Sequence, residues 1–314
     1  MKKTWFNKLT FLFAGVLAVV FLGGCSFSWP GLAGTSADTI KIGSQNTTEQ
    51  QIMANMIQQM IQHYDKDTPT TILNNLGSGN VSFQAQKRGD TDMTAIRYNG
   101  TDYQTVLDLS GETDPKIVND QVFKLMQSRY HMTYFPSYGF ADTYQFMVSQ
   151  KYAKANNLKT ISDMKRVAPD MKVGIDQIWA NRRGDGYSAF QNTYGFSFGH
   201  VYPMQIGLVY DALEAGKMDA VLGYSTDGRI RSYNLKLLRD DKHFFPPYQA
   251  SVVVNDAALK AHPKLKGILS RLNGKINLTT MQELNYQVDN NLVEPAVAAQ
   301  QFLEKHNYFE KGAD

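Results

Sequence analysis

The sequence has one cysteine among 314 residues, Cys25, which excludes an internal disulfide framework and a zinc site built from several cysteines. It also has little net charge. The formal charge of +3 comes from Lys2, Lys3 and Lys8, and the rest of the chain carries 29 basic and 29 acidic residues. A neutral body of this kind argues against nucleic acid as the main partner.

The usual enzyme signatures are also absent. There is no HExxH, no G-x-S-x-G, no P-loop and no dinucleotide glycine fingerprint, and no two histidines stand four residues apart. Asp176 and Asp185 flank Trp179, but such acids are more often structural than a catalytic pair. We therefore predict no catalysis, cofactor or metal. An extracytoplasmic hydrolase stays open as an alternative that turnover of a bound ligand would support.

Residues 1–24 have the pattern of a secretory signal peptide. Three lysines precede an uncharged apolar stretch over residues 9–22, which is too short for a comfortable membrane span. The stretch ends in Leu22-Gly23-Gly24-Cys25, which resembles a bacterial lipobox. This resemblance predicts diacylation of Cys25 and stable anchoring to the outer face of the cell membrane. The alternative is an uncleaved anchor helix with an incidental cysteine. Residues 25–38 are predicted to form a flexible tether.

The mature chain begins with an α/β pattern. Residues 39–43 alternate as a strand, Thr48 and Gln51 could form a capping box for the next helix, and a methionine-rich apolar stripe follows. Strands are predicted over 71–76 and 92–98, with a short helix between them. Strand, helix, strand, helix, strand indicates a parallel α/β unit. Further strands are predicted around 141–150, 171–175 and 250–254, and residues 255–303 read as mainly helical.

A sequence pattern in the first half of the chain recurs in the second half. Residues 85–93 and 212–220 both end a helix at a glycine, turn, and start a strand after an aspartate. The two strands then reach Tyr98 and Tyr224, each followed by small polar residues. Ligands bind beyond the carboxyl ends of strands in open α/β sheets. Two such units facing each other would place both tyrosines in one cleft, although any two βαβ units share part of this likeness.

Several motifs occur together in order: Gly43-Ser44-Gln45, Tyr98-Asn99-Gly100-Thr101, Tyr224-Ser225-Thr226-Asp227-Gly228 and Phe244-Phe245-Pro246-Pro247-Tyr248. With them the chain resembles the substrate-binding lipoproteins of glycine betaine/carnitine/choline ABC transporters. The resemblance implies a two-lobed periplasmic-binding-protein fold of type II, with a ligand cleft between the lobes. Lobe I would comprise residues 39–140 and 248–314, and lobe II residues 141–247. A separate permease and ATPase would be the partners.

The ligand class accounts for the tyrosines. A trimethylammonium group has no N–H to donate, and burying a carboxylate against it would carry a large desolvation cost. Aromatic faces bind such a cation, each contact contributing about 0.5–2 kcal/mol. The resemblance implies that Tyr98, Tyr144 and Tyr224 form this cage, with Tyr248 as a fourth member. Each could instead be a packing residue, and for Tyr248 the two interpretations are evenly matched.

Gln45 and Thr101 complete the predicted site. The resemblance gives Gln45 a polar contact with the ligand, although it could simply cap its own loop. The resemblance implies that threonine at position 101 is typical of family members that accept a broader range of ligands. Aspartate at this position is typical of members restricted to choline. An aspartate would repel the carboxylate of betaine or carnitine, whereas a hydroxyl can donate to it. We therefore expect carboxylated ligands to be accepted.

Two other classes of function remain open from the sequence. One is a receptor for an amino acid or another small anionic solute, with Arg97 and Arg229 as a possible arginine clamp. The other is a structural or adhesive lipoprotein, which would bind no small solute. A structural lipoprotein would not require tyrosines at the ends of corresponding strands in the two halves.

Overall fold

The first of two five-stranded sheets is built from both ends of the chain. A computed structural model describes residues 38–112, 114–182, 185–246 and 248–309, so the predicted signal peptide, Cys25 and most of the tether lie outside the described residues. The first sheet has the order β2-β1-β3-β10-β4 and the second β7-β6-β8-β5-β9. Both sheets belong to one compact unit, Ile40–Asp314.

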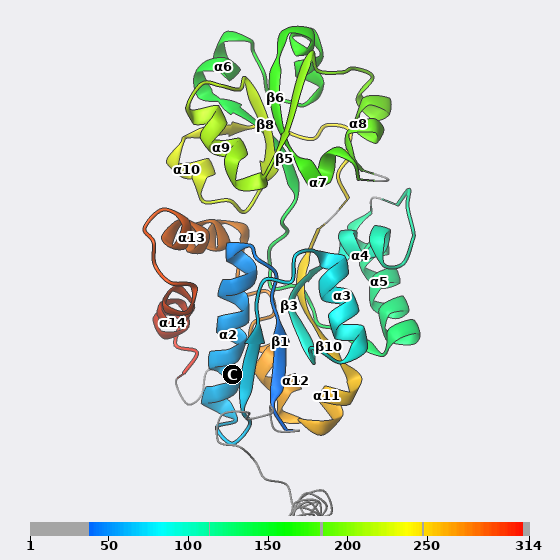
Figure 1. Cartoon of the computed structure of the whole chain (residues 1–314), viewed down its shortest axis with the longest axis vertical. Helices are drawn as coiled ribbons and strands as arrows, with labels where there is room; N and C mark the ends of the chain where they lie inside the picture. Colours follow the sequence, from blue (N-terminus) through cyan, green and yellow to red (C-terminus); the bar gives the residue numbers. More distant parts are fainter. Residues whose placement is uncertain (1–37, 113, 183–184, 247, 310–314) are drawn as a thin grey trace, which may run out of the picture. The chain divides into compact units, whose positions relative to one another are not determined.

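The first sheet alternates strands and helices before a later strand returns to it. β1 pairs in parallel with β2 and β3, and β10 pairs antiparallel with β3 and β4. In Figure 1, α2 and α3 lie on opposite sides of β1 and β3. The elements are β1 (Ile40–Gly43), α2 (Thr48–Tyr64), β2 (Thr70–Leu73), α3 (Gly79–Arg88), β3 (Met93–Tyr98), α4 (Asn99–Thr105), α5 (Pro115–Tyr130), β4 (Met132–Tyr134), β10 (Ala250–Asn255), α11 (Asp256–Ala261), α12 (Lys264–Ser270), α13 (Leu278–Asp289) and α14 (Pro295–Lys305).

The second sheet repeats this plan within the middle of the chain. β6 pairs in parallel with β7 and β8, and β5 pairs antiparallel with β8 and β9. The elements are β5 (Tyr144–Ser149), α6 (Gln150–Ala155), η1 (Ser162–Arg166), η2 (Ala168–Asp170), β6 (Lys172–Asp176), α7 (Gln177–Ala180), α8 (Tyr187–Tyr194), β7 (His200–Met204), α9 (Ile206–Glu214), β8 (Ala220–Tyr224), α10 (Arg229–Ser232) and β9 (Leu235–Leu237).

The internal repeat predicted from the sequence is confirmed at its aspartates and left-handed glycines, although the C-cap of α9 is Ala215 and the glycine follows it. The backbone N–H of Lys41 donates to the Asp92 carboxylate at 2.8 Å, and that of Lys172 donates to Asp219 at 2.8 Å. The glycines that precede these aspartates, Gly89 and Gly216, both have left-handed φ angles of 79° and 65°. In both halves the aspartate therefore ties the start of one strand to the start of its neighbour.

The methionine-rich stripe of α2 is core, as predicted: its apolar residues are fully buried against the first sheet. The predicted capping box is wrong. The N-cap is Thr47, whose side chain makes no cap hydrogen bond, while the Thr48 hydroxyl donates to Asp289 at 2.5 Å. Position 48 faces α13 instead, which the local sequence does not reveal.

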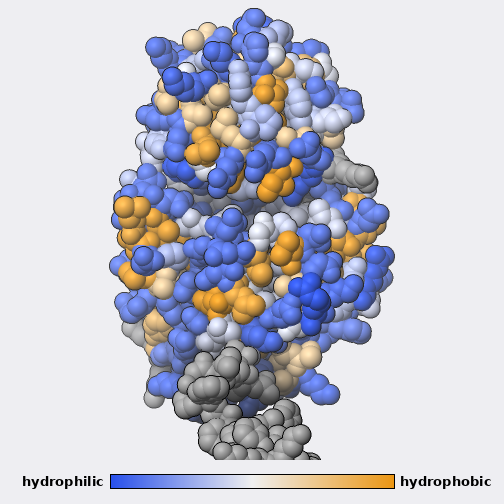
Figure 2. Space-filling view, viewed as in Figure 1, coloured by the Kyte–Doolittle hydropathy of each residue, from blue (hydrophilic) through white to orange (hydrophobic). Residues whose placement is uncertain are grey.

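Hydrophobic residues on the face shown in Figure 2 form separate patches among hydrophilic ones. Scattered exposed apolar side chains are normal for a folded domain. Within the described ranges, no helix combines the length and apolar character needed to cross a membrane.

Candidate ligand-binding site

Three of the predicted cage tyrosines meet at one end of the second sheet. Tyr144 begins β5 and Tyr224 ends β8, and the two are directly paired in the antiparallel register. Their ring centroids are 5.2 Å apart, and the Tyr248 ring lies 6.2 Å from that of Tyr144 in an edge-to-face arrangement. Tyr144 and Tyr248 are buried, and Tyr224 is half-buried. We refer to these three residues as the tyrosine cluster.

Tyr98 reaches this cluster from the first sheet. It is the last residue of β3 and packs against the hydrophobic cores of both sheets. Its hydroxyl donates to the buried carboxylate of Glu49. Burial, followed by the charges of Glu49 and Asp142, raises the pKa of Tyr98 well above its ordinary value. The ring is therefore neutral, and its position is fixed from the hydroxyl end.

Gln45 and Thr101 lie at the same edge of the first sheet as Tyr98, because they follow β1 and β3. Both are half-buried. The main-chain carbonyl of Gln45 accepts a hydrogen bond from the Ser44 hydroxyl at 3.1 Å, and the carbonyl of Thr101 accepts one from Thr105 at 2.8 Å. These contacts use backbone atoms, and among the described contacts none joins either side chain to the tyrosines.

Two buried acids hold the tyrosine cluster by its hydroxyls. Tyr144 donates to Asp176 at 2.9 Å, and Asp176 also caps α7 by accepting from the N–H of Ile178 at 3.2 Å. Tyr248 donates to Asp185. Burial raises the pKa of both tyrosines well above the ordinary value, so their rings stay neutral. The two aspartates singled out in the sequence thus have an orienting role that the sequence did not indicate.

A cation already lies on the faces of this cluster. The guanidinium carbon of Arg182 is 5.4 Å from the ring centroid of Tyr144 and 5.9 Å from that of Tyr248. Both distances are within the range of cation–π attraction. Arg182 also donates to the Tyr248 hydroxyl at 3.3 Å and pairs with Asp185 at 3.5 Å. The site therefore has the geometry to hold a positively charged group.

Arg182 makes a longer ion pair than Arg229, which is half-buried to a similar degree. Its 3.5 Å ion pair contrasts with 2.7 Å for Arg229 and Asp227. Burial opposes its charge, but Tyr144, Tyr248 and Asp185 raise the pKa of the guanidinium overall. Sequence reasoning missed this residue. The available signal was the basic segment after Trp179.

A layer of aromatic rings supports Tyr144 from behind. Trp179 is fully buried, with its ring centroid 6.2 Å from that of Tyr144. It lies 6.1 Å from Phe146 and 6.2 Å from Phe245. Aromatic pairs at these separations contribute beyond their buried area. The tyrosine cluster thus rests on a rigid aromatic core.

The two arginines proposed as an anion clamp are already engaged. Arg97 is buried in an ion pair with Asp102, and Tyr134 donates to the same carboxylate. Arg229 makes a two-point contact with Asp227 at 2.9 and 2.7 Å and lies 4.6 Å from the ring centroid of Tyr210. Internal carboxylates thus occupy both candidates for the anion-receptor alternative.

A polar cluster joins residues from both halves near Tyr98. The Thr226 hydroxyl, just after β8, donates to Asp142 at 2.9 Å, and the Asn285 side chain of α13 donates to the Thr226 carbonyl at 2.9 Å. Burial raises the pKa of Glu49 and raises that of Asp142 well above its ordinary value, and each is raised further by neighbouring acids. One oxygen of Glu49 is buried with no hydrogen-bond partner among the described residues.

The two carboxyls give a pH dependence of stability. Because their pKa values are raised in the folded state, that state holds protons that the unfolded chain releases above about pH 4. The contribution of Glu49 and Asp142 to stability should therefore be greatest below pH 4. It should fall as the pH rises from there through their raised pKa values in the folded state. Glu49→Gln should raise the free energy of unfolding at pH 8 by on the order of 1 kcal/mol and flatten this fall. Urea unfolding at pH 5, 6, 7 and 8 measures it.

A matched control is Asp120→Asn, which removes an acid that is 65% exposed in a surface pair with Lys116. It should leave the pH slope unchanged, since surface pairs contribute little. An equal slope in Glu49→Gln and the native chain would contradict the assignment.

In each sheet the strand that arrives from the other half of the molecule, β10 or β5, pairs antiparallel with its neighbours. This is the fold of type II periplasmic binding proteins, a class of solute receptors. Residues 38–305 match the family described as the substrate binding domain of ABC-type glycine betaine transport systems. The chain belongs to this family.

Similar proteins agree with this assignment. The chain is 50% identical to the carnitine transport binding protein OpuCC of Listeria monocytogenes over 97% of this chain and 98% of that protein. It is 29% identical to the ergothioneine transport permease/ergothioneine binding protein EgtU of Helicobacter pylori, over 84% of this chain and 47% of that protein. A solved glycine betaine/carnitine/choline ABC transporter structure is 47% identical, with a TM-score of 0.78 over 86% of this chain and 100% of that one. The prediction of the family is confirmed.

Proposed function

We propose that the protein is an extracytoplasmic receptor that binds quaternary ammonium osmoprotectants such as glycine betaine, carnitine and choline, and delivers them to an ABC permease. The observation that carries the proposal is the cation on the tyrosine cluster: Arg182 lies over two rings within cation–π distance. A trimethylammonium group would use the same faces. The anion-receptor alternative is weaker because Arg97 and Arg229 are paired internally.

The ligand's two ends would be treated differently. Tyr144, Tyr224 and Tyr248 would enclose the methylated cation, and Tyr98 would close over it from the first half. The loosely held guanidinium of Arg182 would leave the ring faces and pair with a ligand carboxylate, because Arg binds carboxylates through two parallel N–H donors. Gln45 and Thr101 would provide polar contacts from the opposite edge.

The residues outside the described part would fix the location. Lipidation of Cys25 would anchor the receptor to the outer face of the membrane, with residues 25–38 as the tether. The permease and ATPase would be separate chains. In support, the relative EgtU is named as a permease and binding protein in one polypeptide, of which this chain matches about half. We propose lobe boundaries near residues 140 and 247, which fall between β4 and β5 and between β9 and β10 in the sequence.

Isothermal titration calorimetry of the purified protein with glycine betaine, carnitine, choline and a panel of amino acids tests the proposal. Binding of methylated ammonium compounds but not of amino acids supports it. Binding of amino acids alone would favour the anion receptor, and binding of no solute would favour a structural lipoprotein. Release of a chemically altered ligand would show an enzyme.

Thr101→Asp should shift selectivity toward choline. A carboxylate at this position would repel the carboxylate of glycine betaine, so the Kd for glycine betaine should rise by about tenfold more than that for choline, as expected for like charges near a partly exposed site. Calorimetry with both ligands measures the ratio. Thr105→Asp, one turn later in α4 and exposed, is the matched control. Equal losses for both ligands would refute a role of Thr101 at the ligand tail.

A further inference from the structure

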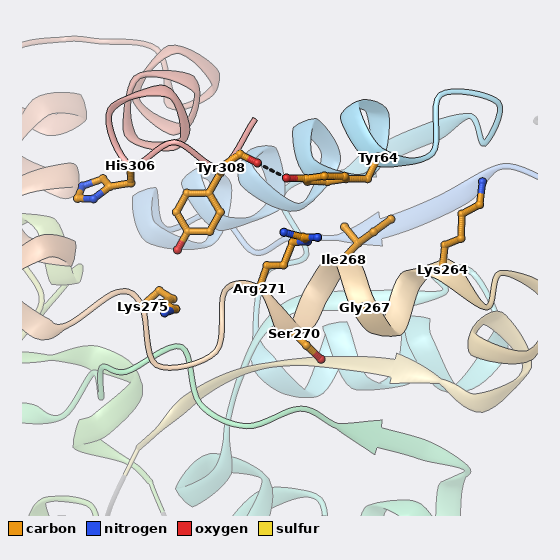
Figure 3. Close-up of a pocket in the computed structure, with 9 residues that line it drawn as sticks. All are labelled: Tyr64, Lys264, Gly267, Ile268, Ser270, Arg271, Lys275, His306 and Tyr308. Atoms are coloured by element: carbon orange, nitrogen blue, oxygen red, sulfur yellow. Dashed lines mark hydrogen bonds between the residues drawn. The ribbon is translucent and has the colours of Figure 1, made fainter. Parts of the chain in front are cut away.

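The C-terminal end of α2 is fastened to its neighbours around a cavity of about 920 Å³ (Figure 3). The Tyr64 hydroxyl donates to the carbonyl oxygen of Tyr308, and the guanidinium carbon of Arg271 lies 4.5 Å from the ring centroid of Tyr64. Lys264, which also lines the cavity, pairs with Asp65 at 2.7 Å. These contacts join α2 to the end of α12 and to the segment after α14, so they hold the helix within the first half.

The opposite end of α2, about 25 Å away, lies beside α13 (Figure 1). There the Thr48 hydroxyl donates to Asp289 at 2.5 Å. Met281 and Leu284 of α13 are buried in the hydrophobic core of the first sheet. α13 is therefore a fixed part of the first half, and a contact between this helix and the second half joins the two.

α13 makes such contacts through two side-chain amides. Gln282 donates to the carbonyl oxygen of Ser225 at 2.7 Å, and Asn285 donates to that of Thr226 at 2.9 Å. Ser225 and Thr226 directly follow Tyr224, the last residue of β8. Gln282 is half-buried, and the other three residues are buried. We refer to Gln282, Asn285, Ser225 and Thr226 as the α13 seam.

Beyond the seam, the loop comes too close to α13 for a side chain at position 228. A Cβ on Gly228 would lie 2.6 Å from both the backbone nitrogen and the Cα of Tyr286. The φ of Gly228 is −64°, an angle that other residues adopt freely, so lack of space and not backbone conformation requires glycine here. Because the helix backbone cannot move aside as the end of a side chain can, a larger residue should separate the loop from α13.

The same loop is bound to the residue that precedes Tyr144. The N–H of Ser225 donates to the carbonyl oxygen of Thr143 at 2.9 Å, and the N–H of Thr143 donates to the Ser225 hydroxyl at 3.0 Å. The position of the loop therefore sets the position of Tyr144 as well as that of Tyr224.

We propose that Gln282 and Asn285 are positioning residues for ligand binding. By holding the loop after β8, they keep Tyr144 and Tyr224 of the second half in place against Tyr98 of the first, and so slow the release of the ligand. The inference rests on the proposed function and deepens it. Because the α13 seam is polar and lies outside the hydrophobic cores of both sheets, its loss should affect affinity more than stability.

Calorimetry and stopped-flow fluorescence with glycine betaine test the proposal. Gly228→Ala should raise the Kd by about tenfold, as for the loss of one or two net hydrogen bonds, with most of the change in the dissociation rate. Gln282→Leu, which keeps the size of the side chain and removes the donor, should raise the Kd by about fivefold. The melting temperature of both variants should stay within about 4 °C of the native value. Should Gly228→Ala fail to fold, Gln282→Leu at its half-buried position carries the test.

Each variant has a matched control. Gly267→Ala changes an exposed glycine of α12, where an added Cβ would meet nothing within 4 Å beyond its own helix. Gln287→Leu changes a half-buried glutamine of α13 whose side chain makes no hydrogen bond among the described contacts. Both should keep the native Kd and dissociation rate.

Native Kd values in the folded Gly228→Ala and Gln282→Leu variants would overturn this inference and leave the proposed function standing. An equal change in Gln287→Leu would also overturn it, because any substitution on α13 would then suffice. If the native chain itself binds no methylated ammonium compound, the proposed function fails and this inference with it, so the two failures are told apart by the native titration.

Discussion

Replacing Tyr144 by alanine is expected to weaken the binding of glycine betaine by about 100-fold or more. This ring lies at the centre of the cluster, 5.2 Å from Tyr224 and 6.2 Å from Tyr248, and it faces the cation that the structure already places there. Its removal eliminates a cation–π contact worth about 0.5–2 kcal/mol and the apolar wall that excludes water from the others. It also leaves the buried Asp176 without its hydroxyl donor, which adds a desolvation cost.

Tyr144→Phe separates the ring from the hydroxyl. It keeps the π-face and loses only the donor to Asp176, so the affinity should stay within about tenfold of the native value. Tyr152→Ala is the matched control. Tyr152 packs against the same hydrophobic core as Tyr144, but among the described contacts its ring touches no member of the tyrosine cluster. Calorimetry gives the affinities. Native-like binding by a folded Tyr144→Ala variant would show that the rings do not form the binding site.

The ends of the strands could be predicted because residues close in the sequence determine them. The helix that stops at a glycine, and the aspartate that starts the next strand, are physical requirements of a βαβ unit, and both halves meet them. The positions of Tyr98 and Tyr224 follow from that regularity. The pairing of Tyr144 with Tyr224 also follows once β5 is known to be antiparallel to β8, because the register then places their rings on one face of the sheet.

The polar contacts of the site could not be predicted in this way. Glu49, Asp142 and Asn285 come from three distant segments, and only the folded chain brings them to Thr226. Arg182 was visible merely as part of a basic stretch, because no local pattern says which ring a flexible side chain will cover. The same limit explains the cap of α2, where the choice between Thr47 and Thr48 depends on α13.

Trp179→Ala should cause the largest loss of stability, about 3–5 kcal/mol, as for other buried aromatic truncations. The indole is 0% accessible to solvent and packs against the rings of Phe146, Phe190 and Phe245. Its Nε1 has no hydrogen-bond partner within the described part of the chain, so the loss is one of packing and not of polar contacts. The melting temperature should fall by on the order of 10 °C.

The same substitution connects the fold to the site. Trp179 supports the ring of Tyr144, so a cavity behind it should let that ring move and should weaken glycine betaine binding even at temperatures where the variant is folded. Trp179→Phe, which keeps an aromatic ring, should restore most of both properties. Urea unfolding and calorimetry measure them separately. A large loss of stability with native affinity would mean that the tyrosine cluster is held by Asp176 and Asp185 alone, and that the aromatic layer serves only the core.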